Sequence, residues 1–291
     1  MTQPHQTGLC TSGPVPIAYR RFGAPGGLPV LVVHGLSYFS YDWIDVAHAL
    51  AAGREVVAID MRGFGDSGRS AERDYSVPSM AADVIAVLDH LGWSRAVLAG
   101  HSMGGRSAAF AAARHPARAA GLVLVDYTPE NAAAGAQRVA RTVAGTPDRF
   151  ESVDAAMRHF GVDPHSPAGA ARRARFEAYL RAVEGGYEIK RDPYFAAQFR
   201  RLLQTGERPQ LGVDMWQVIG EVACPILALR GRQSDMFAPE TVPKMRAANP
   251  RLELIEVEGG HNLAGDNPDG LVAAIGRFLA RLEGGQHGQA A

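Results

Sequence analysis

The sequence has few cysteines, and the two it has lie far apart. Cys10 and Cys224 form no Cys-x-x-Cys pair, so a disulfide framework or a cysteine-based zinc site is not expected. We therefore expect no metal and a reducing compartment, with the cytoplasm as the default location.

Net charge and long hydrophobic runs are also lacking. Lys and Arg number 30 and Asp and Glu number 30, so no overall attraction to nucleic acid or to a membrane surface is expected. No uncharged apolar run approaches the roughly 18 residues that a transmembrane helix needs. The opening stretch MTQPHQTGLC has neither a basic region nor an apolar core, so it does not read as a secretory signal. Hydrophobic residues still make up 46% of the 291 residues, enough for one large core with or without an inserted subdomain.

Short apolar runs alternate with helical patterns along most of the chain. Strands are expected at residues 15–22, 30–33, 55–59, 95–99, 121–125, 225–229 and 252–257. Helices are expected at residues 43–52, 78–91, 106–114, 239–248 and 269–282. Buried strands separated by helices indicate an α/β fold, in which helices cover both faces of a mostly parallel sheet.

This alternation stops between residues 129 and 215. The segment contains Ala-, Arg- and Glu-rich stretches and no strand-like run, so we expect a helical cap laid over the sheet. The domain organisation expected is a first core part at 1–128, the cap at 129–215 and a second core part at 216–291, with a disordered tail from about residue 284. Long insertions in compact domains are usually functional, and one or two inward-pointing cap arginines could hold a substrate carboxylate.

The stretch AGHSMGGRSAAF, residues 99–110, places Ser102 between a predicted strand and a predicted helix. A nucleophilic serine at such a corner has its hydroxyl exposed beside a helix N-terminus, where N–H groups can stabilise an oxyanion. The tight turn crowds the residues two positions on either side, and Gly100 and Gly104 carry no Cβ there. The Gly-x-Ser-x-Gly pattern is weak by itself, so its strand-to-helix context carries the prediction.

A serine nucleophile needs a base and a carboxylate that orients the base. His261 lies in a glycine-flanked loop after the last predicted strand, and Asp235 lies in the loop after the preceding one. All three residues then follow the carboxyl ends of strands, where such sheets place their sites. Asp126, after the strand at 121–125, is a rival for the acid, but Thr128 and Pro129 beside it suit a cap hinge. We therefore predict a catalytic set of Ser102, Asp235 and His261.

With these motifs the chain resembles the α/β-hydrolase-fold family of serine esterases and lactonases. The resemblance covers residues 15–282 and includes His34-Gly35, the segment 60–67, the serine motif, the segment 231–235 and Gly260-His261. It implies that the backbone N–H groups of Leu36 and Met103 form the oxyanion hole. It also implies a lid formed by the cap, and no cofactor.

Other residues near these motifs are expected to serve outside the catalytic set. Tyr38 and Phe39 are close enough in sequence to Leu36 to line an acyl pocket. His34 and His101 are expected to orient loops. The segment 63–68 fits Gly-x-Gly-x-x-Gly, but it runs into a loop instead of opening a helix, so a dinucleotide site is not expected.

The expected activity is hydrolysis of a small carboxylic ester or lactone through an acyl-enzyme on Ser102. One alternative is a hydrolase of carbon–carbon bonds in ring-cleavage diketones, and another is a small-molecule receptor on the same fold. The partner expected is the small-molecule substrate, with no nucleic acid or membrane, and the chain is expected to be a monomer or a homodimer.

Overall fold

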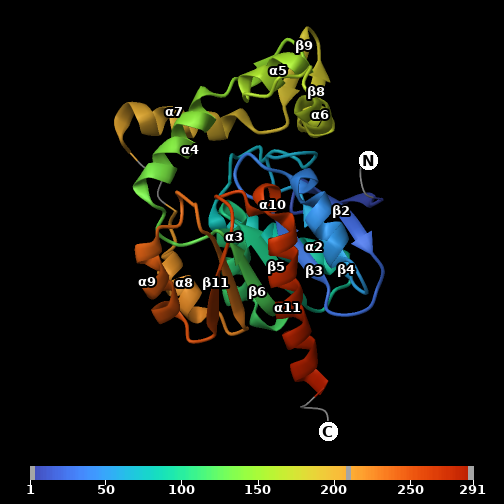
Figure 1. The fold of residues 1–291 in the computed structure, drawn as a ribbon, viewed down its shortest axis with the longest axis vertical. Coiled ribbons are helices and arrows are strands. Elements are labelled where there is room, and N and C mark those ends of the chain that lie inside the picture. The colour runs from blue at the N-terminus through green and yellow to red at the C-terminus, as the bar shows by residue number, and fades with distance from the viewer. Residues whose placement is uncertain (1–3, 208–210, 288–291) are drawn as a thin grey trace.

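A computed structural model describes residues 4–207 and 211–287 of the chain. Its main feature is an eight-stranded sheet (Figure 1). The strands lie side by side in the order β1 (Gln6–Ser12), β2 (Val15–Gly23), β4 (Glu55–Ile59), β3 (Val30–Val33), β5 (Ala96–His101), β6 (Ala119–Val125), β10 (Ile226–Gly231) and β11 (Leu252–Val257). The pairs β1–β2 and β2–β4 are antiparallel, and the strands from β4 to β11 run parallel. The expected α/β fold with a mostly parallel sheet is confirmed.

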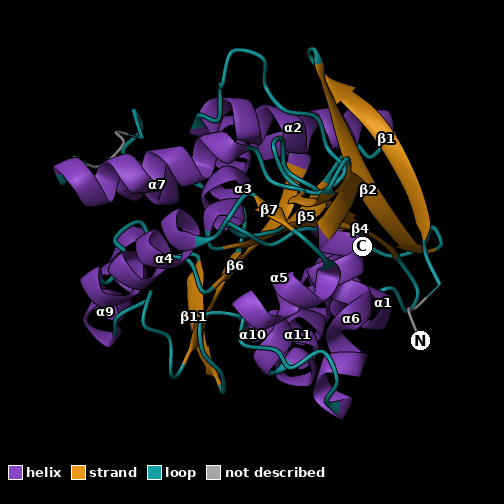
Figure 2. Cartoon of the chain, turned by 90° about the horizontal axis from the view of Figure 1, so that it is seen from above, coloured by secondary structure: helices purple, strands orange, loops and turns teal. Residues whose placement is uncertain are grey.

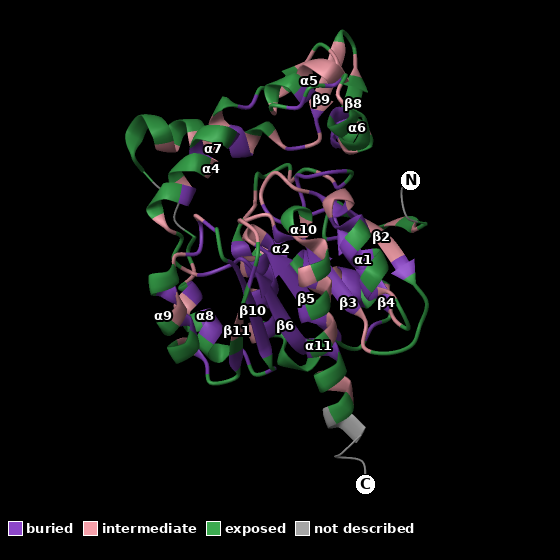
Figure 3. Cartoon of the chain, in the orientation of Figure 1, coloured by how far each residue is buried: buried purple, intermediate pink, exposed green. Residues whose placement is uncertain are grey.

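Helices cover both faces of this sheet because the central strands are apolar on both sides. In β3, Leu31 and Val33 pack into one buried cluster and Val30 and Val32 into another, as the two-residue repeat of a strand requires. The first cluster includes α2 (Val77–His90), α3 (Met103–Arg114), α8 (Met215–Glu221) and α9 (Val242–Ala248). The second includes α1 (Ile44–Leu50) and α11 (Pro268–His287). Figure 3 shows the buried sheet between these partly exposed helices.

Short helical segments complete the core: η1 (Ser40–Trp43), η2 (Pro116–Arg118), η3 (Pro239–Thr241) and α10 (Leu263–Asp266). None of the helices in the described residues is long and apolar enough to cross a bilayer. The predicted disordered tail is wrong for residues 284–287, which continue α11. Residues 288–291 of that tail lie outside the described part.

The segment between β6 and α8 forms a layer above the carboxyl edge of the sheet (Figures 1 and 2). It contains α4 (Ala133–Gly145), β7 (Arg149–Phe150), α5 (Val153–His159), α6 (Pro167–Tyr179), β8 (Leu180–Val183), β9 (Gly186–Ile189) and α7 (Pro193–Thr205). The strands form an antiparallel sheet in the order β7-β9-β8, so the expectation of a cap without strands is wrong. The domain boundaries at residues 128 and 215 stay a prediction.

The cap is joined to the core by the segment that resembled a dinucleotide motif. Phe64 forms an isolated β-bridge with Arg191, Gly65 N donates to the Lys190 carbonyl at 2.8 Å, and Asp192 N donates to the Gly63 carbonyl at 2.7 Å. The main-chain groups of Gly63 and Gly65 therefore bond the cap. The segment opens no helix, since α2 begins at Val77.

Candidate active site

Ser102 occupies the sharp corner between β5 and α3. Its backbone has φ 52° and ψ −116°, a positive φ that non-glycine residues rarely adopt. A Cβ on Gly100 would lie 2.4 Å from the Gly104 carbonyl oxygen, and one on Gly104 would lie 2.3 Å from that of Val33. Both glycines are therefore required by close backbone approach, and the turn presents the Ser102 side chain to the cavity described below.

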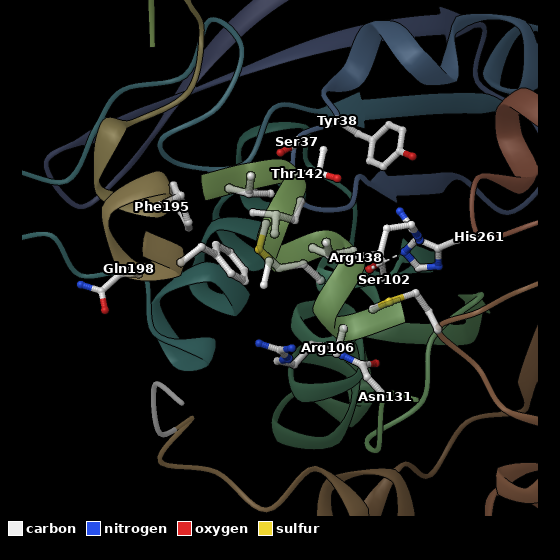
Figure 4. Close-up of a pocket in the computed structure, with 18 of the residues that line it drawn as sticks. Ser37, Tyr38, Ser102, Arg106, Asn131, Arg138, Thr142, Phe195, Gln198 and His261 are labelled. Atoms are coloured by element: carbon white, nitrogen blue, oxygen red, sulfur yellow. Dashed lines mark hydrogen bonds between the residues drawn. The ribbon is translucent and has the colours of Figure 1, made fainter. Parts of the chain in front are cut away.

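His261 follows β11 and contacts Ser102. The Ser102 Oγ and the His261 Nε2 are 3.0 Å apart, and the other ring nitrogen, Nδ1, is 2.6 Å from Asp126 Oδ2. Because a carboxylate accepts, Nδ1 carries the proton, and Nε2 is left with a lone pair for the serine hydroxyl. The ring is thus in the tautomer that a general base needs. Figure 4 shows Ser102 and His261 adjacent at one end of the pocket.

Asp126, directly after β6, is the carboxylate that contacts His261. Its side chain is fully buried and also accepts from the N–H of Gly231 at 2.8 Å and from the hydroxyl of Ser234. Its φ is 45°, so this residue too is held in an unusual turn. Three donors around one buried carboxylate keep it oriented toward the imidazole.

The expectation that Asp235 contacts His261 is wrong. The Asp235 carboxylate instead pairs with Arg138 of α4, with Nη2 and Oδ1 2.7 Å apart. Its main-chain carbonyl accepts from Gly135 N at 3.1 Å, so Asp235 joins the loop after β10 to the first turn of the cap. Asp235 therefore contacts the cap, and the contact with His261 that was expected of Asp235 is made by Asp126.

His34 and His101 bond main-chain groups around the site. His34 Nδ1 donates to the Gly35 carbonyl at 2.7 Å, and its Nε2 accepts from Met61 N at 2.9 Å. His101 Nε2 donates to the His261 carbonyl at 2.8 Å. Burial, together with the neighbouring His261, keeps the pKa of His101 well below its usual value. The neutral ring of His101 therefore adds no positive charge beside the candidate base.

The two oxyanion candidates line the same cavity as Ser102. Met103 is the first residue of α3, whose early N–H groups have no partner within the helix. Leu36 lies in the turn after β3, next to Ser37 with φ 64°. Leu36, Met103 and Ser102 line the same cavity. The oxyanion role of the two N–H groups stays a prediction.

A cavity of about 1630 Å³ opens between the sheet edge and the cap, and Ser102 and His261 line it. It exceeds the 300–1,000 Å³ of common small-molecule pockets. Tyr38 lines it as expected, but Phe39 does not. Phe39 is 1% exposed and packs in the apolar cluster of the cap, so its expected place in the pocket wall is wrong. Across from the serine, Phe195 and Gln198 of α7 reach the cavity (Figure 4).

Arg106 and Tyr127 line the cavity and were not predicted as site residues. Arg106 lies on α3 one turn after Ser102, and Tyr127 follows Asp126 directly. Ser102 directly precedes α3, so Arg106 lies in the first turn of that helix, where its N–H donates to the Ser102 carbonyl at 3.3 Å. The short spacing from the predicted nucleophile was a readable signal. Within residues 4–207 and 211–287, no group of three His, Cys, Asp or Glu side chains could hold a metal ion.

Comparison with known proteins shows the family to which the chain belongs. A model of the alpha/beta hydrolase fold matches residues 29–268. The chain is 28% identical over 254 residues to 2-(acetamidomethylene)succinate hydrolase from Mesorhizobium japonicum, covering 86% of this chain and 87% of that protein. It is 30% identical over 258 residues to 3-hydroxybutyrate-oligomer hydrolase from Cupriavidus necator, covering 84% and 86%. The crystal structure of E-2-(acetamidomethylene)succinate hydrolase superposes with a TM-score of 0.81 at 25% identity, covering 95% of this chain and 100% of that one.

The matched residues span both core parts and the cap, and they include Ser102, Asp126 and His261. The family resemblance read from the motifs is therefore confirmed. The chain belongs to the alpha/beta hydrolase fold family, and it is a hydrolase of that superfamily.

Proposed function

We propose that this hydrolase cleaves a small carboxylic ester or lactone through an acyl-enzyme on Ser102. The observation that carries the proposal is the pair of hydrogen bonds from Ser102 Oγ to His261 and from His261 to Asp126. This chain of contacts opens on a cavity that could hold a small molecule. The acid in the mechanism is Asp126, which replaces Asp235 of the sequence-based prediction.

In the first half-reaction His261 Nε2 takes the Ser102 proton while Oγ attacks the carbonyl carbon of the substrate. The N–H groups of Leu36 and Met103 stabilise the oxyanion that forms. The imidazolium then protonates the leaving alcohol, and the buried Asp126 carboxylate stabilises the ring while it is charged. A water molecule repeats the sequence on the acyl-enzyme and releases the acid. Water is the only co-reactant that the balance needs.

The names of two relatives favour particular bonds. A relative named as a 3-hydroxybutyrate-oligomer hydrolase favours an ester, since hydroxy acids join through ester bonds. A relative named as a 2-(acetamidomethylene)succinate hydrolase favours an acetamide as the second candidate. Both bonds suit the same acyl-transfer chemistry, so a substrate panel must include esters, lactones and acetamides.

The test is hydrolysis of p-nitrophenyl acetate and butyrate by wild type and Ser102→Ala. We expect Ser102→Ala to lose about 10⁴-fold or more of kcat, because the nucleophile is gone. The matched control is Ser107→Ala, because Ser107 lies on the same helix and lines the same cavity but bonds the Met103 carbonyl. This control should keep most of the activity.

A fluorophosphonate reagent with peptide mass mapping gives an independent reading, and the adduct should sit on Ser102. Wild-type turnover in Ser102→Ala, or an adduct elsewhere, would refute the nucleophile. Binding of small molecules without any hydrolysis of the panel would favour a receptor.

A further inference from the structure

Among the described residues six arginines line the cavity, and they differ in how their charge is compensated. They are Arg73, Arg106, Arg138, Arg172, Arg175 and Arg191. Three of them pair with carboxylates: Arg138 with Asp235, Arg175 with Asp42 and Arg191 with Asp148. Two others, Arg73 and Arg172, are exposed to solvent. Water compensates the charge of these exposed side chains.

Arg106 fits neither group. It is partly buried, it lines the cavity, and among the described residues no carboxylate lies within ion-pair distance of it. A charge taken out of water without a counter-ion is costly. Burial accordingly lowers the pKa of Arg106, whereas the hydrogen bonds that Arg138 donates to Asp235 raise the pKa of Arg138. The guanidinium of Arg106 therefore lacks an anion.

The neighbour of Arg106 has an unused hydrogen-bonding group as well. Arg106 interacts electrostatically with the Tyr127 side chain, and Tyr127 is 4% exposed. A guanidinium can only donate, so Arg106 contacts the Tyr127 oxygen and cannot accept the hydroxyl proton. The Tyr127 hydroxyl is buried, and no described residue accepts its proton. Buried hydroxyls are nearly always paired, so this one lacks an acceptor that the free protein does not supply. Both side chains line the cavity that holds Ser102.

We propose that Arg106 and Tyr127 form a subsite that binds a carboxylate of the substrate, which rests on the function proposed above. A guanidinium fork and a hydroxyl donor together match the two oxygens of a carboxylate. Arg106 is four residues after Ser102 on α3, roughly 6 Å along the helix axis at 1.5 Å per residue. The substrate carboxylate is thus several bonds away from the carbonyl that Ser102 attacks. The substrate class is an ester that carries a free carboxylate, such as the half-ester of a dicarboxylic acid.

The first experiment compares two esters that differ in this charge, mono-p-nitrophenyl adipate and p-nitrophenyl hexanoate. We expect wild type to prefer the adipate in kcat/KM. In Arg106→Gln this preference should fall at least about tenfold, because a hydrogen bond to a charged group is lost. The change should lie mostly in KM, since the contact is remote from the reacting carbonyl.

Three further variants sharpen this comparison. Tyr127→Phe should lower the preference by a smaller factor, because it removes only a neutral donor. Arg106→Lys should keep part of it, since the charge stays while the fork geometry is lost. Arg172→Gln is the matched control, an exposed cavity arginine whose loss should leave the preference unchanged.

A second pair of esters moves the carboxylate to the leaving group: 4-carboxyphenyl butyrate and phenyl butyrate. A preference in this pair that depends on Arg106 would place the carboxylate on the alcohol side. A preference in the adipate pair would place it on the acyl side. No preference in either pair, or one that Arg106→Gln keeps, would overturn the subsite.

Binding without turnover separates the subsite from the reaction. Adipate should inhibit wild type competitively, or bind Ser102→Ala in calorimetry, and neutral adipamide should not. Adipate binding that requires Arg106, with no ester cleaved, would refute the proposed function and keep the subsite. Hydrolysis of neutral esters through Ser102, with adipate binding no better than adipamide, would refute the subsite and keep the function. The comparison of adipate with adipamide needs no Arg106 variant, so it stands even if Arg106→Gln fails to fold.

Discussion

The carboxyl edge of the sheet and the cap above it hold their charged side chains in different ways. At the sheet edge Asp126 is fully buried and receives hydrogen bonds from a main-chain N–H, a serine and His261. In the seam to the cap, Asp235 and Arg138 pair with 38% and 50% of their side chains exposed. Buried, multiply bonded groups keep one geometry, while exposed ion pairs contribute little and rearrange easily.

This difference separates the part of the molecule that would carry out the reaction from the part that would select the substrate. The residues that would transfer protons come from the ends of β5, β6 and β11, which are parallel strands of one rigid sheet. The cavity wall facing them comes largely from α4 and α7 of the cap, which contact each other. The sheet edge can therefore serve the reaction while the cap changes to suit the substrate.

The largest expected effect is the loss of activity in Asp126→Asn, with Asp235→Asn as its comparison. Asp126→Asn should lower kcat by about 10³ to 10⁴, because an amide next to Nδ1 favours the wrong imidazole tautomer. Asp235→Asn should cost less than about tenfold, since its carboxylate contacts Arg138 and not the ring. The measurement is steady-state kinetics on p-nitrophenyl butyrate, with circular dichroism to check folding. The reverse ranking in two folded variants would contradict the assignment of Asp126.

The acid shows what the sequence could predict and what it could not. β6 and β10 are parallel neighbours, so Asp126 and the 231–235 loop both reach the same sheet edge, and chain order fits either aspartate. The choice depends on the backbone turn at Asp126, with φ 45°, and on donors from Gly231 and Ser234. Gly231 begins the loop that was predicted to bring Asp235 to His261, but its N–H donates to Asp126, and a Cβ on it would lie 2.2 Å from the Gly260 carbonyl oxygen. Such contacts between distant loops leave no local sequence signal.

Most strands of the core were predicted, and β1 and the strands of the cap were missed for different reasons. The apolar runs of the parallel strands carry their own signal because they are buried on both faces. β1 is an edge strand with mostly exposed residues, and its burial pattern gives little periodicity. In the cap, Glu184 and Gly185 form the two-residue turn between β8 and β9, and Gly185 has φ 78°. Glycine at such a turn is a hairpin signal, but the strands beside it are short and only partly buried.

The second expected effect concerns a more buried ion pair between core and cap. Arg175 of α6 contacts Asp42 of η1, with Nε and Oδ1 2.5 Å apart, and the two side chains are 26% and 11% exposed. Arg175→Gln should lower the free energy of unfolding by about 2–3 kcal/mol, because Asp42 stays buried without its counter-charge. Urea unfolding measures the difference.

The matched control for this pair lies within the cap. Arg201 pairs with Glu207, and their side chains are 66% and 67% exposed, so Arg201→Gln should change stability by less than about 0.5 kcal/mol. If Arg175→Gln and Arg201→Gln lowered the free energy of unfolding equally, the burial of the Arg175–Asp42 pair would not make it stronger than the exposed Arg201–Glu207 pair.

The smallest expected effect is the pH dependence of the Asp235–Arg138 pair. Hydrogen bonds from Arg138 hold the pKa of Asp235 below its usual value. A carboxylate whose pKa is lowered by folding stabilises the protein above its unfolded pKa, and this stabilisation is lost as pH falls through the lowered folded value. At neutral pH the pair should contribute less than about 1 kcal/mol, because both side chains are well exposed. The difference in unfolding free energy between wild type and Asp235→Asn should therefore be small at pH 7 and shrink further below about pH 4.

The control for this last measurement is Glu258→Gln, since Glu258 pairs with Arg232 and their side chains are 63% and 57% exposed. Raising the salt concentration should reduce the Asp235 difference at neutral pH, as expected for a solvent-exposed pair. A difference that grows as pH falls would have the wrong sign for a lowered pKa. A loss of several kcal/mol at neutral pH would instead mean that Asp235 is held as firmly as the buried Asp126. That result would contradict the difference between the firmly held charges of the sheet edge and the exposed ion pair that joins the cap to the loop after β10.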